Sequence, residues 1–108
     1  MKLSEQRCVP RAGQPPMPDD EIDYYLGELS GWARAEGAGA LEKTYAFATF
    51  HETMAFANAI AWLAEREDHH PDLAITPGRC AVRLATHAVG GLSMNDFICA
   101  AKIDALLP

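Results

Sequence analysis

The sequence predicts an α+β fold in which helices alternate with pairs of antiparallel strands. Two hydrophobic periods support this prediction: apolar residues recur every three to four positions in three segments and every second position in two others. Each strand segment contains a break or turn signal, so it is expected to fold into a hairpin, and hairpin strands are antiparallel. The expected order is helix, two strands, helix, two strands, helix.

The first helix is expected to begin at Asp19, because acidic residues crowd its first turn and apolar residues follow at helical spacing. Ser30-Gly31 supplies a stop signal after it. The first strand pair follows, broken at residues 37–39, and apolar and polar side chains alternate over 41–49. This alternation predicts a strand with one face toward the core.

The second helix is expected over about 50–67, because a T-x-x-E capping box begins at Thr49 and an Ala-rich amphipathic segment follows. Pro77-Gly78 suits the centre of a type II turn, which predicts a second hairpin around it. The last helix is expected after Ser93, which stands at capping-box spacing from Asp96.

A chain of 108 residues with 49% hydrophobic residues is long enough for one domain with its own core. Residues 1–18 contain four prolines, which fix φ and lack a backbone donor, so they are expected to form an extended arm. The single domain is expected to occupy 19–108.

Composition and charge exclude several classes of protein. The net charge of −6 and the lack of a Lys/Arg cluster argue against direct binding to nucleic acid. The longest apolar stretch is about half of the roughly 20 residues that span a bilayer, and no signal peptide is recognisable at the N-terminus. A cytoplasmic protein is expected.

The three cysteines share no C-x-x-C spacing, and their odd number favours reduced thiols over a disulfide framework. Cys80 and Cys99 fall on apolar faces and are expected to be packing residues. Cys8 lies in the arm and is expected to be more exposed, and a reactive role for it is the less favoured interpretation.

Three histidines stand where secondary structure changes: His69 and His70 after the second helix, and His87 after the last strand. The second hairpin could bring both places to one edge of the sheet, with Asp96 one turn into the next helix. Imidazole acts as acid or base near neutral pH, and a carboxylate can fix its tautomer. These residues are therefore candidates for acid–base catalysis.

The spacing alone favours a structural alternative. Histidines at the end of a helix interact favourably with its dipole by about 0.3–1 kcal/mol, and Asp96 would serve as a helix cap. Three imidazoles could also bind a metal, but the adjacent His69 and His70 point in different directions. No metal and no cofactor is therefore expected.

Four segments resemble the pterin-4a-carbinolamine dehydratase family, and the resemblance covers nearly the whole chain. They are residues 65–72 (E-R-E-D-H-H-P-D), 84–87 (L-A-T-H), 90–93 (G-G-L-S) and 96–97 (D-F). The resemblance implies a four-stranded antiparallel sheet with helices on one face. It also implies a homodimer or a dimer of dimers, and activity without a metal.

Members of this family dehydrate a 4a-hydroxytetrahydropterin to the quinonoid dihydropterin. The resemblance implies an acid–base set with a supporting carboxylate, and a second group of residues that lines the pterin. The first set is His69, His70, His87 and Asp96, and the second is Asp68, Ala85, Thr86 and Ala88.

The chain departs from the family motif at one place. The motif has an aromatic residue, usually Tyr, six positions after His-His-Pro, and this chain has Pro77. An aromatic ring there could pack beneath the histidines or steady the hairpin. This departure favours an alternative: a catalytically inactive, pterin-dehydratase-like assembly factor of the α-carboxysome, whose partner would be the Rubisco large subunit. A coactivator role, as in animal members, ranks last.

Overall fold

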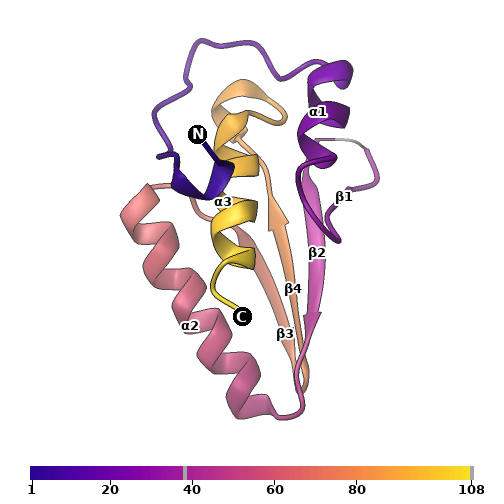
Figure 1. Ribbon diagram of the computed structural model, residues 1–108, viewed down its shortest axis with the longest axis vertical. Helices are drawn as coiled ribbons and strands as arrows, with labels where there is room; N and C mark the ends of the chain where they lie inside the picture. Colours follow the sequence, from indigo (N-terminus) through magenta and orange to yellow (C-terminus); the bar gives the residue numbers. More distant parts are fainter. Residues whose placement is uncertain (38, 108) are drawn as a thin grey trace.

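The computed structural model describes residues 1–37 and 39–107 and has the predicted order of elements (Figure 1). Ala38, in the predicted break between the first two strands, and Pro108, the last residue of the predicted domain, lie outside the described residues. The elements are α1 (Asp19–Leu26), β1 (Ala33–Arg34), β2 (Leu41–Ala46), α2 (Phe50–Glu67), β3 (Asp72–Thr76), β4 (Arg79–Leu84) and α3 (Met94–Asp104), with short 3-10 helices η1 (Leu3–Glu5) and η2 (His87–Val89).

The four strands form one antiparallel sheet in the order β1-β2-β4-β3. The two predicted hairpins are present, and they join through the central pair β2 and β4, which runs from Leu41 opposite Leu84 to Ala46 opposite Arg79. The helices cover one face of this sheet. The predicted α+β class and the four-stranded antiparallel sheet are confirmed.

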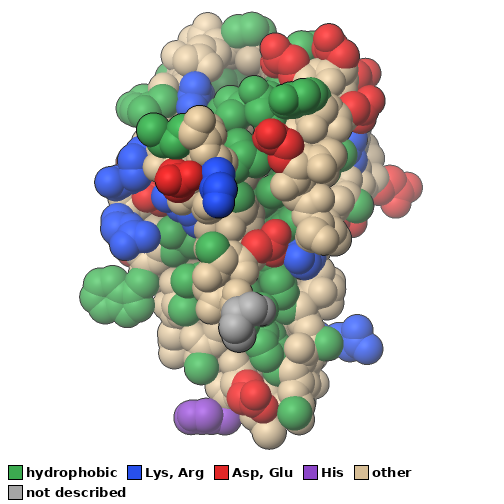
Figure 2. Space-filling model, viewed as in Figure 1, with side chains coloured by type: hydrophobic (Ala, Val, Ile, Leu, Met, Phe, Trp, Pro, Cys, Tyr) green, Lys and Arg blue, Asp and Glu red, His purple; other side chains and the backbone are tan. Residues whose placement is uncertain are grey.

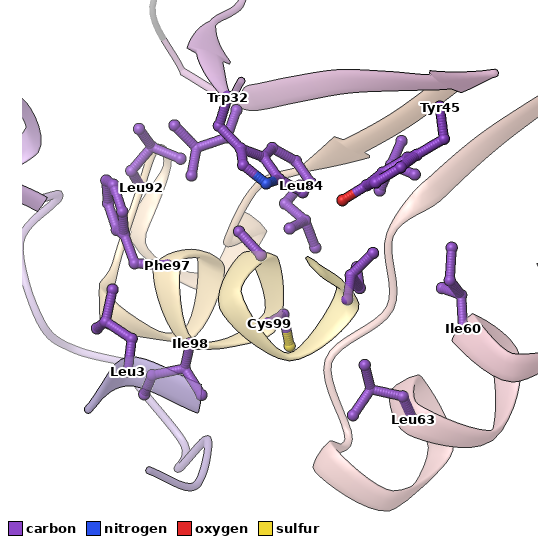
Figure 3. Close-up of a cluster of buried hydrophobic side chains, with 14 of the residues drawn as sticks. Leu3, Trp32, Tyr45, Ile60, Leu63, Leu84, Leu92, Phe97, Ile98 and Cys99 are labelled. Carbon is purple, nitrogen blue, oxygen red and sulfur yellow. The ribbon is translucent and has the colours of Figure 1, made fainter. Parts of the chain in front are cut away.

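The core lies between the sheet and the helices, where side chains from both layers point toward one another (Figure 3). Leu41, Leu84 and Phe97 have no exposed surface. Cys80 and Cys99 are buried, as expected of packing residues. The alternation of buried and exposed residues along β2 and β4 explains this arrangement, because successive side chains of a strand point to opposite faces.

The helix α2 begins where the sequence predicts, because the Thr49 hydroxyl oxygen accepts a hydrogen bond of 3.1 Å from the Glu52 N–H. The helix ends because Asp68 adopts a left-handed conformation, with φ of 53°. This conformation is sterically unfavourable for most residues other than glycine, and Asp tolerates it better than most. It turns the chain sharply at the residue before the two histidines.

The N-terminal arm is ordered against the rest of the domain. It begins with the 3-10 turn η1, which precedes the first proline, and the Leu3 side chain is part of the hydrophobic core. Further along, the Met17 N–H donates to the Leu92 carbonyl at 2.8 Å. The arm therefore packs along α3.

Charge is unevenly distributed on one face of the molecule. Figure 2 shows Asp and Glu side chains gathered at the upper right, over α1, and Lys and Arg side chains at the left, near the end of α2. Within residues 1–37 and 39–107, no helix is both long and apolar enough to span a bilayer.

Replacing Phe97 with Ala is expected to lower the free energy of unfolding by about 3–5 kcal/mol, because the lost ring leaves a cavity in a fully buried part of the core. The same change at Phe50, which is 52% exposed, is expected to cost about 0.5 kcal/mol or less. Urea unfolding of both variants measures the difference, and equal losses would contradict the assignment of Phe97 to the core.

Candidate active site

The candidate site lies where the end of α2, the end of β4 and the start of α3 meet. Because β3 and β4 are antiparallel, Asp72 pairs with Arg83, and the segment before β3 returns to the same end of the sheet as the segment after β4. His69 and Thr86 belong to these two segments. The hairpin therefore brings together residues that lie apart in the sequence.

Asp96 is the centre of a hydrogen-bond network and has no exposed surface. One carboxylate oxygen, Oδ2, accepts from the Thr86 hydroxyl at 2.7 Å and from the Ser93 N–H at 3.0 Å. The other oxygen, Oδ1, lies 2.7 Å from Nε2 of His69. Asp96 thus caps α3 and also orients His69. The two roles that the sequence suggests for Asp96, helix cap and partner of a histidine, therefore occur together.

Ser93 completes the network and was predicted only as a helix cap. Its hydroxyl accepts from the Asn95 N–H at 3.2 Å and lies 2.8 Å from the Thr86 hydroxyl. Thr86 therefore contacts both Ser93 and Asp96. Capping-box spacing was the signal that identified Ser93, but the contact with Thr86 depends on the tertiary fold.

His69 is held by its backbone as well as by its ring. Its N–H donates to the Ala64 carbonyl at 3.2 Å after the left-handed turn at Asp68. Burial disfavours the charged ring, but the hydrogen bond and the charge of Asp96 outweigh that cost and raise the pKa of His69 above its ordinary value. The ring is therefore stabilised in its protonated form.

The other two histidines lie outside this network. His70 is exposed, and its Nε2 lies 3.2 Å from Oε1 of Glu65. His87 is exposed at the start of η2 and lines a hollow of about 430 Å³. The hollow is also lined by Glu36, Gly37, Gly39, Asp72, Arg83, Ala85, Thr86, Gly90 and Gly91.

The structure therefore joins some of the sequence-derived candidates and separates others. His69, Thr86 and Asp96 form one network, and Ala85 and Thr86 share the hollow with His87. The remaining candidates, Asp68, His70 and Ala88, are exposed. Three residues of the hollow, Glu36, Asp72 and Arg83, were missed, because nothing in their local sequence separates them from ordinary surface charges.

A metal site is not apparent in the described part of the chain, where no group of three or more His, Cys, Asp or Glu side chains is placed to hold an ion.

The fold and the site define a protein with an α+β domain in which the buried Asp96 orients His69, and Thr86 of the same network lines a hollow with His87. The family model of pterin 4 alpha carbinolamine dehydratase matches residues 15–106. The chain belongs to the pterin-4a-carbinolamine dehydratase family.

Two curated relatives are similar over nearly the whole chain. One is a protein of Chromobacterium violaceum named "Putative pterin-4-alpha-carbinolamine dehydratase", which is 50% identical over 107 residues, covering 98% of this chain and 96% of the relative. A protein of Stenotrophomonas maltophilia with the same name is 50% identical over 105 residues, covering 96% of this chain and 90% of the relative.

Two solved structures have a similar fold. A "transcriptional coactivator/pterin dehydratase from Brucella Melitensis" is 31% identical with a TM-score of 0.81, covering 84% of this chain and 97% of that one. A "pterin dehydratase-like protein" identified as "a RuBisCO assembly factor in the alpha-carboxysome" is 26% identical with a TM-score of 0.61. The match covers 71% of this chain and 89% of that one.

Replacing Asp96 with Asn is expected to lower the pKa of His69, because the variant removes the negative charge that favours the imidazolium. An NMR titration of the His69 ring measures this. The control is Asp72→Asn, which removes an exposed carboxylate without touching the network. An unchanged pKa in Asp96→Asn would contradict the role assigned to Asp96.

The raised pKa of His69 also predicts a pH dependence of stability. Because the folded state binds the proton more tightly than the unfolded state, the stabilisation is fully present below the ordinary pKa of 6.5 and is lost as pH rises through the raised value. The difference in unfolding free energy between the wild type and His69→Gln should therefore shrink as pH rises from about 5 to 9. Urea unfolding across this range measures it, and a constant difference would be the contrary result.

Proposed function

We propose that the protein is a working pterin-4a-carbinolamine dehydratase, which converts a 4a-hydroxytetrahydropterin to the quinonoid dihydropterin by acid–base catalysis. The observation that carries this proposal is the 2.7 Å contact between His69 and the buried Asp96. A carboxylate in this position fixes the tautomer of the ring and stabilises its charge. Membership of the family supports the same conclusion.

The reaction needs a proton donor at the departing C4a oxygen and a base for the proton on N5. His69 suits the donor role, because its raised pKa keeps the ring protonated to higher pH. His87, which lines the hollow together with Thr86, would take the N5 proton. His70, whose side chain is exposed, would lie closest to the reacting centre.

The pterin would lie against the end of the sheet. Ala85 and Thr86 line the hollow beside His87, and Asp68 and Ala88 flank the histidines in sequence and are exposed to a ligand. No step of this proposal requires a metal or a cofactor.

The position of Pro77 does not argue against activity. The register places Thr76 opposite Arg79, so Pro77 and Gly78 form the turn at the end of the hairpin far from Asp72 and His69. At about 3.3 Å per residue, the five residues of β3 separate that turn from the site by roughly 17 Å. A residue at 77 therefore cannot pack beneath the histidines, and the left-handed Gly78 completes the turn without an aromatic ring.

An assembly factor for the Rubisco large subunit, associated with the α-carboxysome, is the second candidate. The observation that favours it is an exposed apolar surface on α2 and the chain end, where Trp62 is 81% exposed and Leu106 39%. Large exposed apolar patches mark protein–protein contacts. The same surface would equally suit the dimer or dimer of dimers that the family resemblance implies.

The dehydration of chemically generated 4a-hydroxytetrahydropterin, followed by stopped flow, tests the proposal. The wild type is expected to exceed the uncatalysed rate, and His70→Ala or His87→Ala should lower the enhancement by about 10²- to 10⁴-fold. His51→Ala is the matched control, since His51 is exposed near the start of α2, at the other end of this 18-residue helix.

A wild-type rate equal to the uncatalysed rate would reject the proposed dehydratase activity. A Rubisco refolding and assembly assay then tests the second candidate, with Trp62→Ala expected to reduce the yield of assembled Rubisco and His51→Ala expected to leave it unchanged.

A further inference from the structure

The sulfur atoms of Cys8 and Cys99 lie 3.5 Å apart, although 91 positions separate them in the sequence. We propose that these two thiols are a site of reversible oxidation, at which a peroxide converts them to a disulfide that ties the N-terminal arm to α3. This proposal concerns a part of the molecule outside the histidine network and does not depend on dehydratase activity.

Hydrogen bonds to α2 and α3 hold Cys8, a residue of the arm, in place. The Cys8 N–H donates to Oε1 of Glu67 at 2.9 Å, and the Cys8 thiol lies 3.6 Å from the Asn95 carbonyl oxygen. The next residue, Val9, donates to the Asn95 side chain at 3.2 Å and accepts from it at 2.8 Å. The meeting of the two sulfur atoms is therefore fixed by a set of hydrogen bonds.

Cys99 supplies the second thiol from a rigid element. It is 2% exposed on α3, and Figure 3 shows its sulfur on the side of the helix away from the sheet. A disulfide needs a sulfur–sulfur distance of about 2.05 Å, so the two atoms must approach by roughly 1.5 Å. The irregular arm can supply this movement more easily than a helix or a strand.

The two thiols have different chemical environments. Cys8 is partly exposed, and the hydrogen bond with Cys99 outweighs burial and lowers the pKa of the Cys8 thiol. The same hydrogen bond and burial raise the pKa of the Cys99 thiol. Since the thiolate is the nucleophile, Cys8 is the residue that meets the oxidant and Cys99 is the residue that resolves the product.

With hydrogen peroxide as oxidant, the step balances. The Cys8 thiol first loses its proton, and the resulting thiolate attacks one peroxide oxygen. The O–O bond breaks, and the hydroxide that leaves combines with that proton to form water. The Cys99 sulfur then attacks the resulting sulfenic acid, and the sulfenic hydroxyl leaves with the Cys99 proton as a second water. Two thiols are oxidised, one peroxide is reduced, and one disulfide forms.

The experiment treats the folded full-length protein with hydrogen peroxide, quenches it, and alkylates it under denaturing conditions. In the reduced protein, all three free cysteines should be alkylated. In the oxidised protein, only Cys80 should be alkylated. Intact mass should fall by two hydrogens before alkylation, and peptide mapping should find residues 8 and 99 in one cross-linked peptide. A dithiol should restore all three labels.

Single-residue variants test whether Cys8 and Cys99 form the cross-link. Cys8→Ser and Cys99→Ala should each abolish the cross-link, and Cys80→Ala should keep it, since Cys80 projects from β4 into the core. Cys8 is partly exposed, so its variant remains informative if Cys99→Ala does not fold. A protein that keeps three thiols after peroxide, a disulfide that includes Cys80 or joins two chains, or oxidation of Cys8 without a cross-link would each overturn the proposal.

Discussion

The carboxylate of Asp96 is the constraint on which the candidate site depends. A buried carboxylate is stable only when charged or hydrogen-bonded partners replace the water it has lost. Asp96 has three such partners, His69, Thr86 and Ser93, which come from the end of α2, the end of β4 and the cap of α3. Each element contributes one donor, so the network forms only when all three elements are in their native positions.

A second buried carboxylate serves the N-terminal arm in a similar way. The Glu67 side chain is 1% exposed, and its partners are the Cys8 N–H and the Arg7 guanidinium at 2.9 Å. Burial opposes the charge, but the Cys8 hydrogen bond and the cations of Lys102 and Arg7 outweigh it and hold the pKa of Glu67 below its ordinary value. The end of α2 therefore anchors both the histidine segment and the arm.

Local signals predicted the elements, and the contacts between distant segments could not be predicted in the same way. The start of α2 follows from the Thr49 capping box, which involves only neighbouring residues. The packing of the arm depends on Leu3, Cys8 and Asn95, whose contacts cross most of the chain. Pro77 shows the same limit: its identity was plain in the sequence, but its distance from the histidines required the register of β3 and β4.

The helix α3 contacts both the candidate site and the arm, because its residues at different positions face different neighbours. Asn95 and Cys99 are four residues apart and so lie on one face of the helix, where both contact Cys8. Asp96 is one position further round and points to His69. The arm and the histidine network therefore contact neighbouring faces of the first turns of α3, and both arrangements depend on where that one helix lies.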